Sequence, residues 1–106
     1  MPRVDPEFNQ KVYETVGQIP KGKVMTYGQV AAICGAAWAA WEVGQIAHYG
    51  PSELPWHRVV NKKGGLASGF VGGGREKQRA LLDAEGIIFI DDNVDINSFQ
   101  WHPELK

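Results

Sequence analysis

The sequence predicts a single small domain that is mainly helical and carries a minor β-hairpin. Three observations predict this class. Apolar residues recur at helical spacing near the N-terminus, two more helical patterns follow with a glycine between them, and a β-branched pair precedes a glycine-rich turn. The length of 106 residues suits one compact domain spanning 1–106. A hydrophobic fraction of 43% and a charged fraction of 22% are typical of a soluble globular protein.

The first helix is expected over residues 6–18. Phe8, Val12 and Val16 fall on one helical face, as the residues of a core-facing stripe do. Asp5-Pro6 supplies an N-cap and a first-turn proline, and a glycine ends the segment.

A second helix is expected to start after Thr26 and to stop at Gly35. Thr26 is a good N-cap, and Gln29 three residues later completes a capping box. A third helix is expected over residues 37–48. Two short helices joined by a tight glycine-containing connection are typical of a helix-turn-helix, so a winged helix-turn-helix-like architecture is the expected fold.

The third expected helix is rich in small residues. Ala39, Ala40 and Gly44 would let its backbone lie close to a DNA groove, as a recognition helix does. The same residues would also permit close packing against another helix, so both interpretations stay open here.

The second half of the chain begins with β-branched and turn residues. Val59-Val60, a turn over 61–65 and Leu66-Ala67 predict a small hairpin or wing. The glycine-rich segment 68–74 is expected to be a flexible loop. It is not a phosphate-binding loop, because no Gly-Lys-Ser/Thr follows it.

A last helix is expected over 75–84. We expect it to pack three residues into the core: Ala80, Leu81 and Leu82. The apolar run 87–90 is expected to be a buried extended segment and 91–95 an acidic surface turn. The tail 87–106 as a whole is expected to pack on the body.

Charge and side-chain chemistry restrict the function classes. The net charge is −1, divided into +2 over residues 1–90 and −3 over 91–106, which permits local phosphate contacts but no strong long-range steering. The single cysteine cannot form an internal disulfide, so an intracellular setting is expected, cytoplasmic or, in a eukaryote, nuclear. The three histidines lie too far apart for a metal site, and no metal or cofactor is expected. No apolar run approaches the ~20 residues that span a bilayer, so no membrane association is expected.

From about Phe8 to Gly86 the chain resembles the O6-alkylguanine-DNA alkyltransferases, in their DNA-binding and catalytic domain. The matching segments occur in the family's order: Ile19-Pro20-Lys21-Gly22-Lys23-Val24, Thr26-Tyr27-Gly28, Val30-Ala31, Val43-Gly44, Pro55-x-His57-Arg58-Val59-Val60 and Leu82-x-x-Glu85-Gly86. Trp56 stands where the family has its nucleophilic cysteine. This tryptophan, the short length and the tail Trp101-His102-Pro103 resemble the alkyltransferase-like members. Those proteins bind O6-alkylguanine in DNA without repairing it and pass the lesion to nucleotide excision repair.

The resemblance implies a non-enzymatic function. We expect the chain to bind O6-alkylguanine in duplex DNA through minor-groove insertion of the helix-turn-helix, and to flip the damaged base into a pocket. The implied partners are duplex DNA and nucleotide excision repair proteins.

The resemblance also implies roles for individual residues. Tyr27 matches a tyrosine that rotates the phosphodiester of the lesion. Glu85 and His57 match the relay that activates the cysteine in the catalytic members. Here they are expected to hydrogen-bond one another through water and to hold the pocket floor, while Arg58 braces the site.

Trp56 and Val71 are the two pocket residues that depart from the catalytic family. The Trp56 indole either offers a face for the flipped base, a stacking contact worth ~1–3 kcal/mol, or fills the cavity. Val71 stands where the family has a pocket serine, and it cannot hydrogen-bond O6.

The sequence also departs from the family at Trp41, which takes the position of the arginine that replaces the flipped base in the duplex. Trp41 is expected either to wedge between bases or to be buried with Trp38 against a helix or a second subunit.

Two rival functions stay open. One is a residual alkyltransferase with Cys34 as acceptor, although its place on an apolar helical face indicates a buried, inert thiol. The other is a protein-interaction module that has lost DNA binding and uses the two tryptophans.

Overall fold

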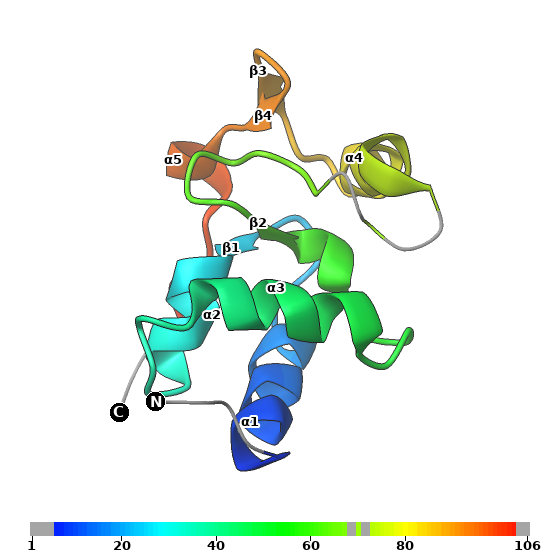
Figure 1. Ribbon diagram of the computed structural model, residues 1–106. Helices are drawn as coiled ribbons and strands as arrows, with labels where there is room; N and C mark the ends of the chain where they lie inside the picture. Colours follow the sequence, from blue (N-terminus) through cyan, green and yellow to red (C-terminus); the bar gives the residue numbers. More distant parts are fainter. Residues whose placement is uncertain (1–5, 68–69, 71–72, 104–106) are drawn as a thin grey trace.

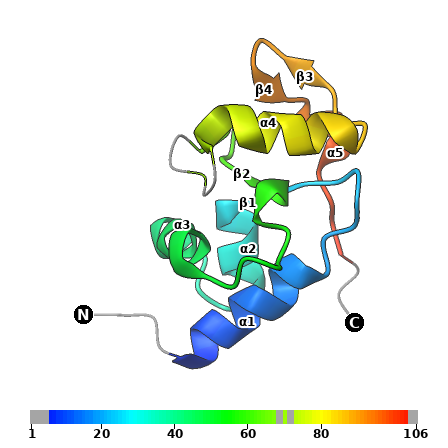
Figure 2. The same ribbon diagram turned by 90° about the vertical axis from the view of Figure 1, so that its right-hand side faces the viewer.

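The computed structural model describes residues 6–67, 70 and 73–103, and within them it is mainly helical with two small sheets. The elements in chain order are α1 (Pro6–Gly17), β1 (Met25–Thr26), α2 (Tyr27–Ile33), α3 (Ala40–Tyr49), the 3-10 turn η1 (Trp56–Arg58), β2 (Val59–Val60), α4 (Gly74–Ala84), β3 (Phe89–Ile90), β4 (Asn93–Val94) and α5 (Ile96–Phe99). Helices α1, α2 and α3 gather at one end of the molecule, and the β3–β4 hairpin projects beyond α4 at the other (Figures 1 and 2). The predicted fold class is confirmed.

Helix α1 forms where the apolar spacing predicts it. Phe8, Val12 and Val16 are all buried and enter one core cluster with α2 and α3. The helix ends at Gly17, one residue earlier than expected. The predicted N-cap Asp5 lies outside the described residues.

The capping box of α2 is confirmed. The Thr26 side chain accepts a hydrogen bond from the Gln29 backbone N–H at 3.1 Å, and the Gln29 side chain accepts one from the Thr26 N–H at 3.3 Å. These two bonds satisfy donors that the first turn of a helix leaves free. After the helix the chain turns at Gly35, where φ is +90°, a conformation that glycine adopts without steric cost.

Helix α3 begins three residues later than predicted. The Ala39 N–H donates to the Ala36 carbonyl at 2.8 Å, so these residues form a turn that delays the helix until Ala40. Trp38 therefore lies in the turn before α3, outside the helix that contains Trp41.

The predicted hairpin at 59–67 is wrong. Val59 and Val60 are completely buried, and β2 pairs in parallel with β1 in the register Met25 to Val59 and Thr26 to Val60. The following loop is closed by the Asn61 side chain, which accepts backbone N–H bonds from residues 63 and 65. The antiparallel hairpin is instead β3–β4, turned by Asp91 and Asp92 with positive φ values.

The C-terminal third differs from the sequence expectation in its burial. In α4 the buried residues are Gln78 and Leu82, whereas Ala80 is exposed. Of the run 87–90, Ile87 is buried but Ile88 and Ile90 are 61% and 57% exposed. Side chains alternate between the faces of a strand, so the run covers the core with one face only.

The described part of the tail contacts the body through β1 and α2. Gln100 forms a parallel bridge with Val24, and the Trp101 N–H donates to the Val24 carbonyl at 2.7 Å. The Gln29 side chain donates to the Trp101 carbonyl. The short helix α5 just before this segment was not predicted. No helix in the described part of the chain is long and apolar enough to cross a membrane.

Candidate functional site

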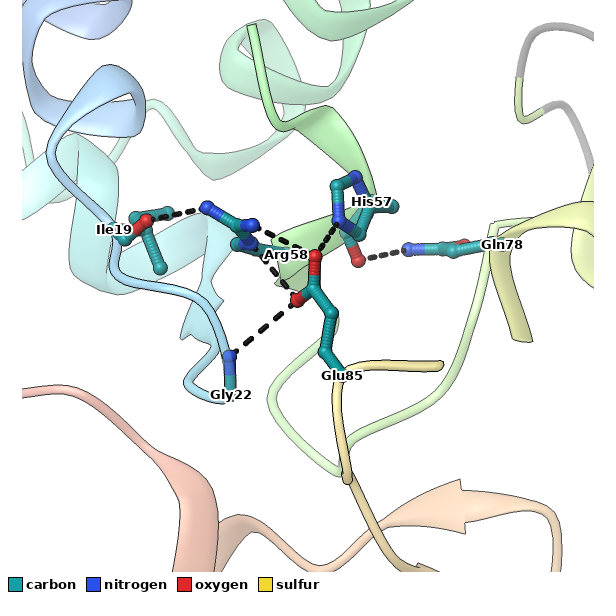
Figure 3. A network of polar contacts seen from close by, with 6 residues as sticks. All are labelled: Ile19, Gly22, His57, Arg58, Gln78 and Glu85. Carbon is teal, nitrogen blue, oxygen red and sulfur yellow. Dashed lines mark hydrogen bonds and ion pairs between the residues drawn. The ribbon is translucent and has the colours of Figure 1, made fainter. Parts of the chain in front are cut away.

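The carboxylate of Glu85 lies at the centre of a polar cluster between α4, η1 and the loop after α1 (Figure 3). His57 Nε2 donates to Glu85 Oε2 at 2.8 Å. Arg58 donates to both carboxylate oxygens, from Nε at 2.9 Å and from Nη2 at 2.7 Å. The expectation of a water between His57 and Glu85 is therefore wrong, because the two side chains are in direct contact.

Electrostatics keep this carboxylate ionised. Burial by itself raises the pKa of Glu85, but the hydrogen bonds and charges of Arg58 and His57 outweigh it and lower the pKa from 4.5 to about 2. Arg58 also donates from Nη1 to the Ile19 carbonyl at 2.8 Å, and the Gly22 N–H points to Oε1 at 3.4 Å. The cluster thus ties the loop after α1 and the end of α4 to η1.

Gln78 is a supporting residue that sequence reasoning missed. Its buried side chain donates to the carbonyls of His57 and Val59, each at 3.1 Å, and accepts from the Ala67 N–H at 2.8 Å. These bonds fix α4 against η1 and β2. The signal that could have found it is its position four residues before Leu82, on the apolar face of the helix.

A cavity of about 930 Å³ opens beside this cluster, walled by α3 on one side and by α4 on the other. Among the described residues that line it are Tyr27, Ala40, Trp41, Gly44, Trp56, His57, Phe70, Lys77 and Leu81. The volume lies at the upper end of the roughly 300–1,000 Å³ typical of ligand pockets.

Trp56 forms part of the cavity wall and is itself buried, with 9% of the residue exposed. Its indole N–H donates to the Pro51 carbonyl at 2.8 Å, and its ring meets Tyr13 edge to face at a centroid distance of 6.1 Å. A Cβ on Gly50 would lie 2.5 Å from the indole, so glycine is needed for this close approach. The indole is fixed from three sides, yet the cavity stays open next to it.

Apart from Trp41, the remaining predicted site residues fall into three groups. Tyr27, Ala40 and Gly44 are half-buried and line the cavity, and burial raises the pKa of the Tyr27 phenol. Ala39 is completely buried in the core, so its predicted place at a DNA-facing surface is wrong. Val71 lies outside the described residues.

Trp41 is 71% exposed and stands at the rim of the cavity. Trp38, in the preceding turn, is 56% exposed and does not line the cavity. Burial of the two tryptophans against a helix of this chain is therefore wrong.

Cys34 lies away from this cavity. It is buried at the end of α2 and lines a separate hollow of about 220 Å³ between α1, α2 and the tail. Burial raises the pKa of its thiol, although a contact with the Thr15 hydroxyl at 3.6 Å lowers it in part. In the described residues no group of three or more histidine, cysteine or acidic side chains could hold a metal ion.

Comparisons with known proteins agree with this geometry. The family model described as "6-O-methylguanine DNA methyltransferase, DNA binding domain" matches residues 7–87. Alkyltransferase-like protein 1 of Schizosaccharomyces pombe is 35% identical over 104 residues, which covers 92% of this chain and 96% of that protein. The DNA base-flipping protein of Escherichia coli is 39% identical over 98 residues, covering 90% of this chain and 74% of that protein.

Solved structures give the same result. The crystal structure of S. pombe Atl1 in complex with damaged DNA containing O6-carboxymethylguanine superposes with a TM-score of 0.84 at 32% identity, over 95% of this chain and 100% of that chain. The O6-methylguanine methyltransferase of Mycobacterium tuberculosis gives 0.67 at 36% identity, over 78% of this chain and 50% of that chain. The family match, the relatives and the shared fold together show that this chain belongs to the 6-O-methylguanine DNA methyltransferase DNA-binding domain family.

Proposed function

We propose that this chain binds O6-alkylguanine in duplex DNA, receives the flipped base in the cavity and transfers no alkyl group. The observation that carries this proposal is Trp56. By the resemblance of Pro55-x-His57-Arg58 to the family's motif, it occupies the position of the nucleophilic cysteine. It lies close to the bonded His57 and Glu85 pair, at the wall of an open cavity of about 930 Å³. An indole has no ionisable thiol and cannot accept an alkyl group by displacement.

Binding by this route has a favourable energy source. Extruding a base costs a few kcal/mol, and less for a damaged base that pairs and stacks poorly. Aromatic walls at Tyr27, Trp56 and Phe70 recover energy by packing the base and its alkyl group. The names of the S. pombe and E. coli relatives, alkyltransferase-like and base-flipping, support the same function.

Two further parts of the proposal rest on the resemblance to alkyltransferase-like proteins. We propose that the bound lesion is passed to nucleotide excision repair proteins. We also propose that the protein acts inside the cell, where its DNA substrate lies.

The test is a paired binding and mass measurement. We expect tighter binding to a duplex with one O6-methylguanine than to the same duplex with guanine, at one moderate salt concentration. We also expect an unchanged protein mass after incubation with the lesion. Equal affinity for the two duplexes would refute lesion recognition, and a methyl group gained on Cys34 would refute the absence of transfer.

We propose that Trp41 is the side chain that enters the duplex. It stands exposed at the cavity rim, in the first turn of α3, where a side chain can wedge between bases. Helix α3 contains no lysine or arginine, and Glu42 follows Trp41 directly. The contact of Trp41 with DNA therefore depends on stacking and releases few counterions from the phosphates.

Trp41→Arg is expected to tighten DNA binding and to make it more salt-dependent, with a log–log salt slope steeper by about 1. The guanidinium adds a positive charge to a helix that has no lysine or arginine, and the phosphates that flank the entered base step attract that charge. Trp38→Arg is the matched control, because it adds the same charge to an exposed tryptophan that does not line the cavity. Affinity and slope would be measured from titrations at several salt concentrations.

The second candidate function is a protein-interaction module on the same fold. The exposure of both Trp38 and Trp41 favours it, because exposed large apolar side chains close together mark contact surfaces. If Trp41→Arg left affinity and salt slope unchanged, Trp41 would not meet DNA, and this second candidate would gain support.

A further inference from the structure

The described part of the cavity wall carries a positive charge and no carboxylate. Among the described residues that line it, Lys77 is the one side chain with a permanent positive charge, and none is an aspartate or a glutamate. The nearby Glu85 carboxylate is already engaged by Arg58 and His57. An anion that entered the cavity would therefore meet a cation and no carboxylate on its wall.

Lys77 lines the cavity from α4 and is exposed to solvent in the free protein. It lies one turn before Leu81 on α4, and both residues line the same wall. In the described part of the chain its ammonium has no ion pair or hydrogen bond. Arg79, two residues further on, instead pairs with Asp92 at 3.2 Å and Asp83 at 3.8 Å on the outside of α4.

We propose that Lys77 makes this cavity selective for O6 adducts that end in an anion, a carboxylate above all, over neutral adducts of the same size. The inference rests on the proposed function and names the substrate class of that site. A hydrogen bond between an ammonium and a carboxylate is stronger than one between neutral groups. It strengthens further when a bound duplex excludes water from the cavity.

The experiment compares three duplexes that differ at one nucleotide: O6-carboxymethylguanine, its neutral amide O6-carbamoylmethylguanine, and guanine. The wild-type protein is expected to bind the carboxymethyl duplex about tenfold more tightly than the amide, as one charge-assisted hydrogen bond allows. Lys77→Met keeps the length of the side chain and removes the charge, and is expected to abolish that ratio. Lys23→Met removes a cation from an exposed loop that does not line the cavity, and is expected to preserve the ratio.

Three results would overturn the inference. A wild-type protein that binds the acid and the amide equally has no selectivity for charge. A uniform loss of affinity for all three duplexes in Lys77→Met would place the lysine on a backbone phosphate, which carries no information about the adduct. If the wild-type protein preferred neither lesion to guanine, the proposed function itself would fail, which is distinct from the first two results.

Discussion

Replacing Trp56 with alanine is expected to lower the free energy of unfolding by about 4 kcal/mol, the range in which buried aromatic truncations fall. The indole is buried, packs on Tyr13 and satisfies the Pro51 carbonyl. Its removal leaves a void and takes away that hydrogen bond. Urea unfolding followed by circular dichroism measures the change. Trp56→Phe keeps an aromatic ring but removes the indole N–H, and is expected to lower the free energy of unfolding by about 1–2 kcal/mol. This variant provides the test if the alanine variant does not fold.

Trp41→Ala is the matched control, since it makes the same truncation at a residue that is 71% exposed. Its free energy of unfolding is expected to stay within about 0.5 kcal/mol of the parent. A loss at Trp41 as large as the loss at Trp56 would contradict the placement of the two side chains. The two variants also separate stability from binding, because Trp41→Ala is expected to weaken DNA binding in a fully folded protein.

Glu85→Gln is expected to lower the free energy of unfolding by about 3 kcal/mol at pH 7. The carboxylate, whose side chain is only 10% exposed, holds Arg58 and His57, and an amide leaves the guanidinium without its counter-charge. The lowering of the Glu85 pKa from 4.5 to about 2 corresponds to a similar energy. Asp83→Asn on the same helix is the matched control. Its ion pair with Arg79 is exposed and 3.8 Å long, so we expect a loss below about 1 kcal/mol.

The pH dependence of the Glu85→Gln effect follows from the direction of the pKa shift. A carboxyl whose pKa is lower in the folded state stabilises that state fully above its unfolded pKa, here 4.5, and the contribution is lost as the pH falls towards about 2. The difference between parent and Glu85→Gln is therefore expected to be constant from pH 7 to pH 5 and to shrink below pH 4. Urea titrations across this range would show it, and a difference that persisted undiminished at the lowest pH would contradict the ionised cluster.

The parts of the fold that depend on neighbouring residues could be predicted from the sequence. The apolar stripe of α1 and the capping box of Thr26 and Gln29 involve contacts within one or two turns, which residue spacing reveals. The pairing of β2 could not be predicted, because its partner β1 lies more than thirty residues earlier. Two consecutive buried valines look the same in a hairpin as in a parallel pair.

The candidate site was predictable in its members but not in its contacts. The resemblance pointed to Glu85, His57 and Arg58. The residue types alone do not decide whether His57 and Glu85 bond directly, as they do here, or through a water. Ala39 was misplaced because the predicted third helix began too early. Ala39 precedes the buried Val43 by four residues, and its N-cap carbonyl accepts the first helical hydrogen bond from that residue, so both face the core.

The position of β1 at the centre of the molecule has a consequence for how the protein is made. Segments near residues 25, 60 and 100 lie side by side there, with β2 on one edge and the tail on the other. Contacts between residues so distant along the chain form late in folding, because closing the long loop between them costs conformational entropy. The tail lies more than seventy residues after β1, so the N-terminal helices are made first and wait for this neighbour to be translated. Until that happens, the apolar surface they share with the tail stays open to solvent and to chaperones.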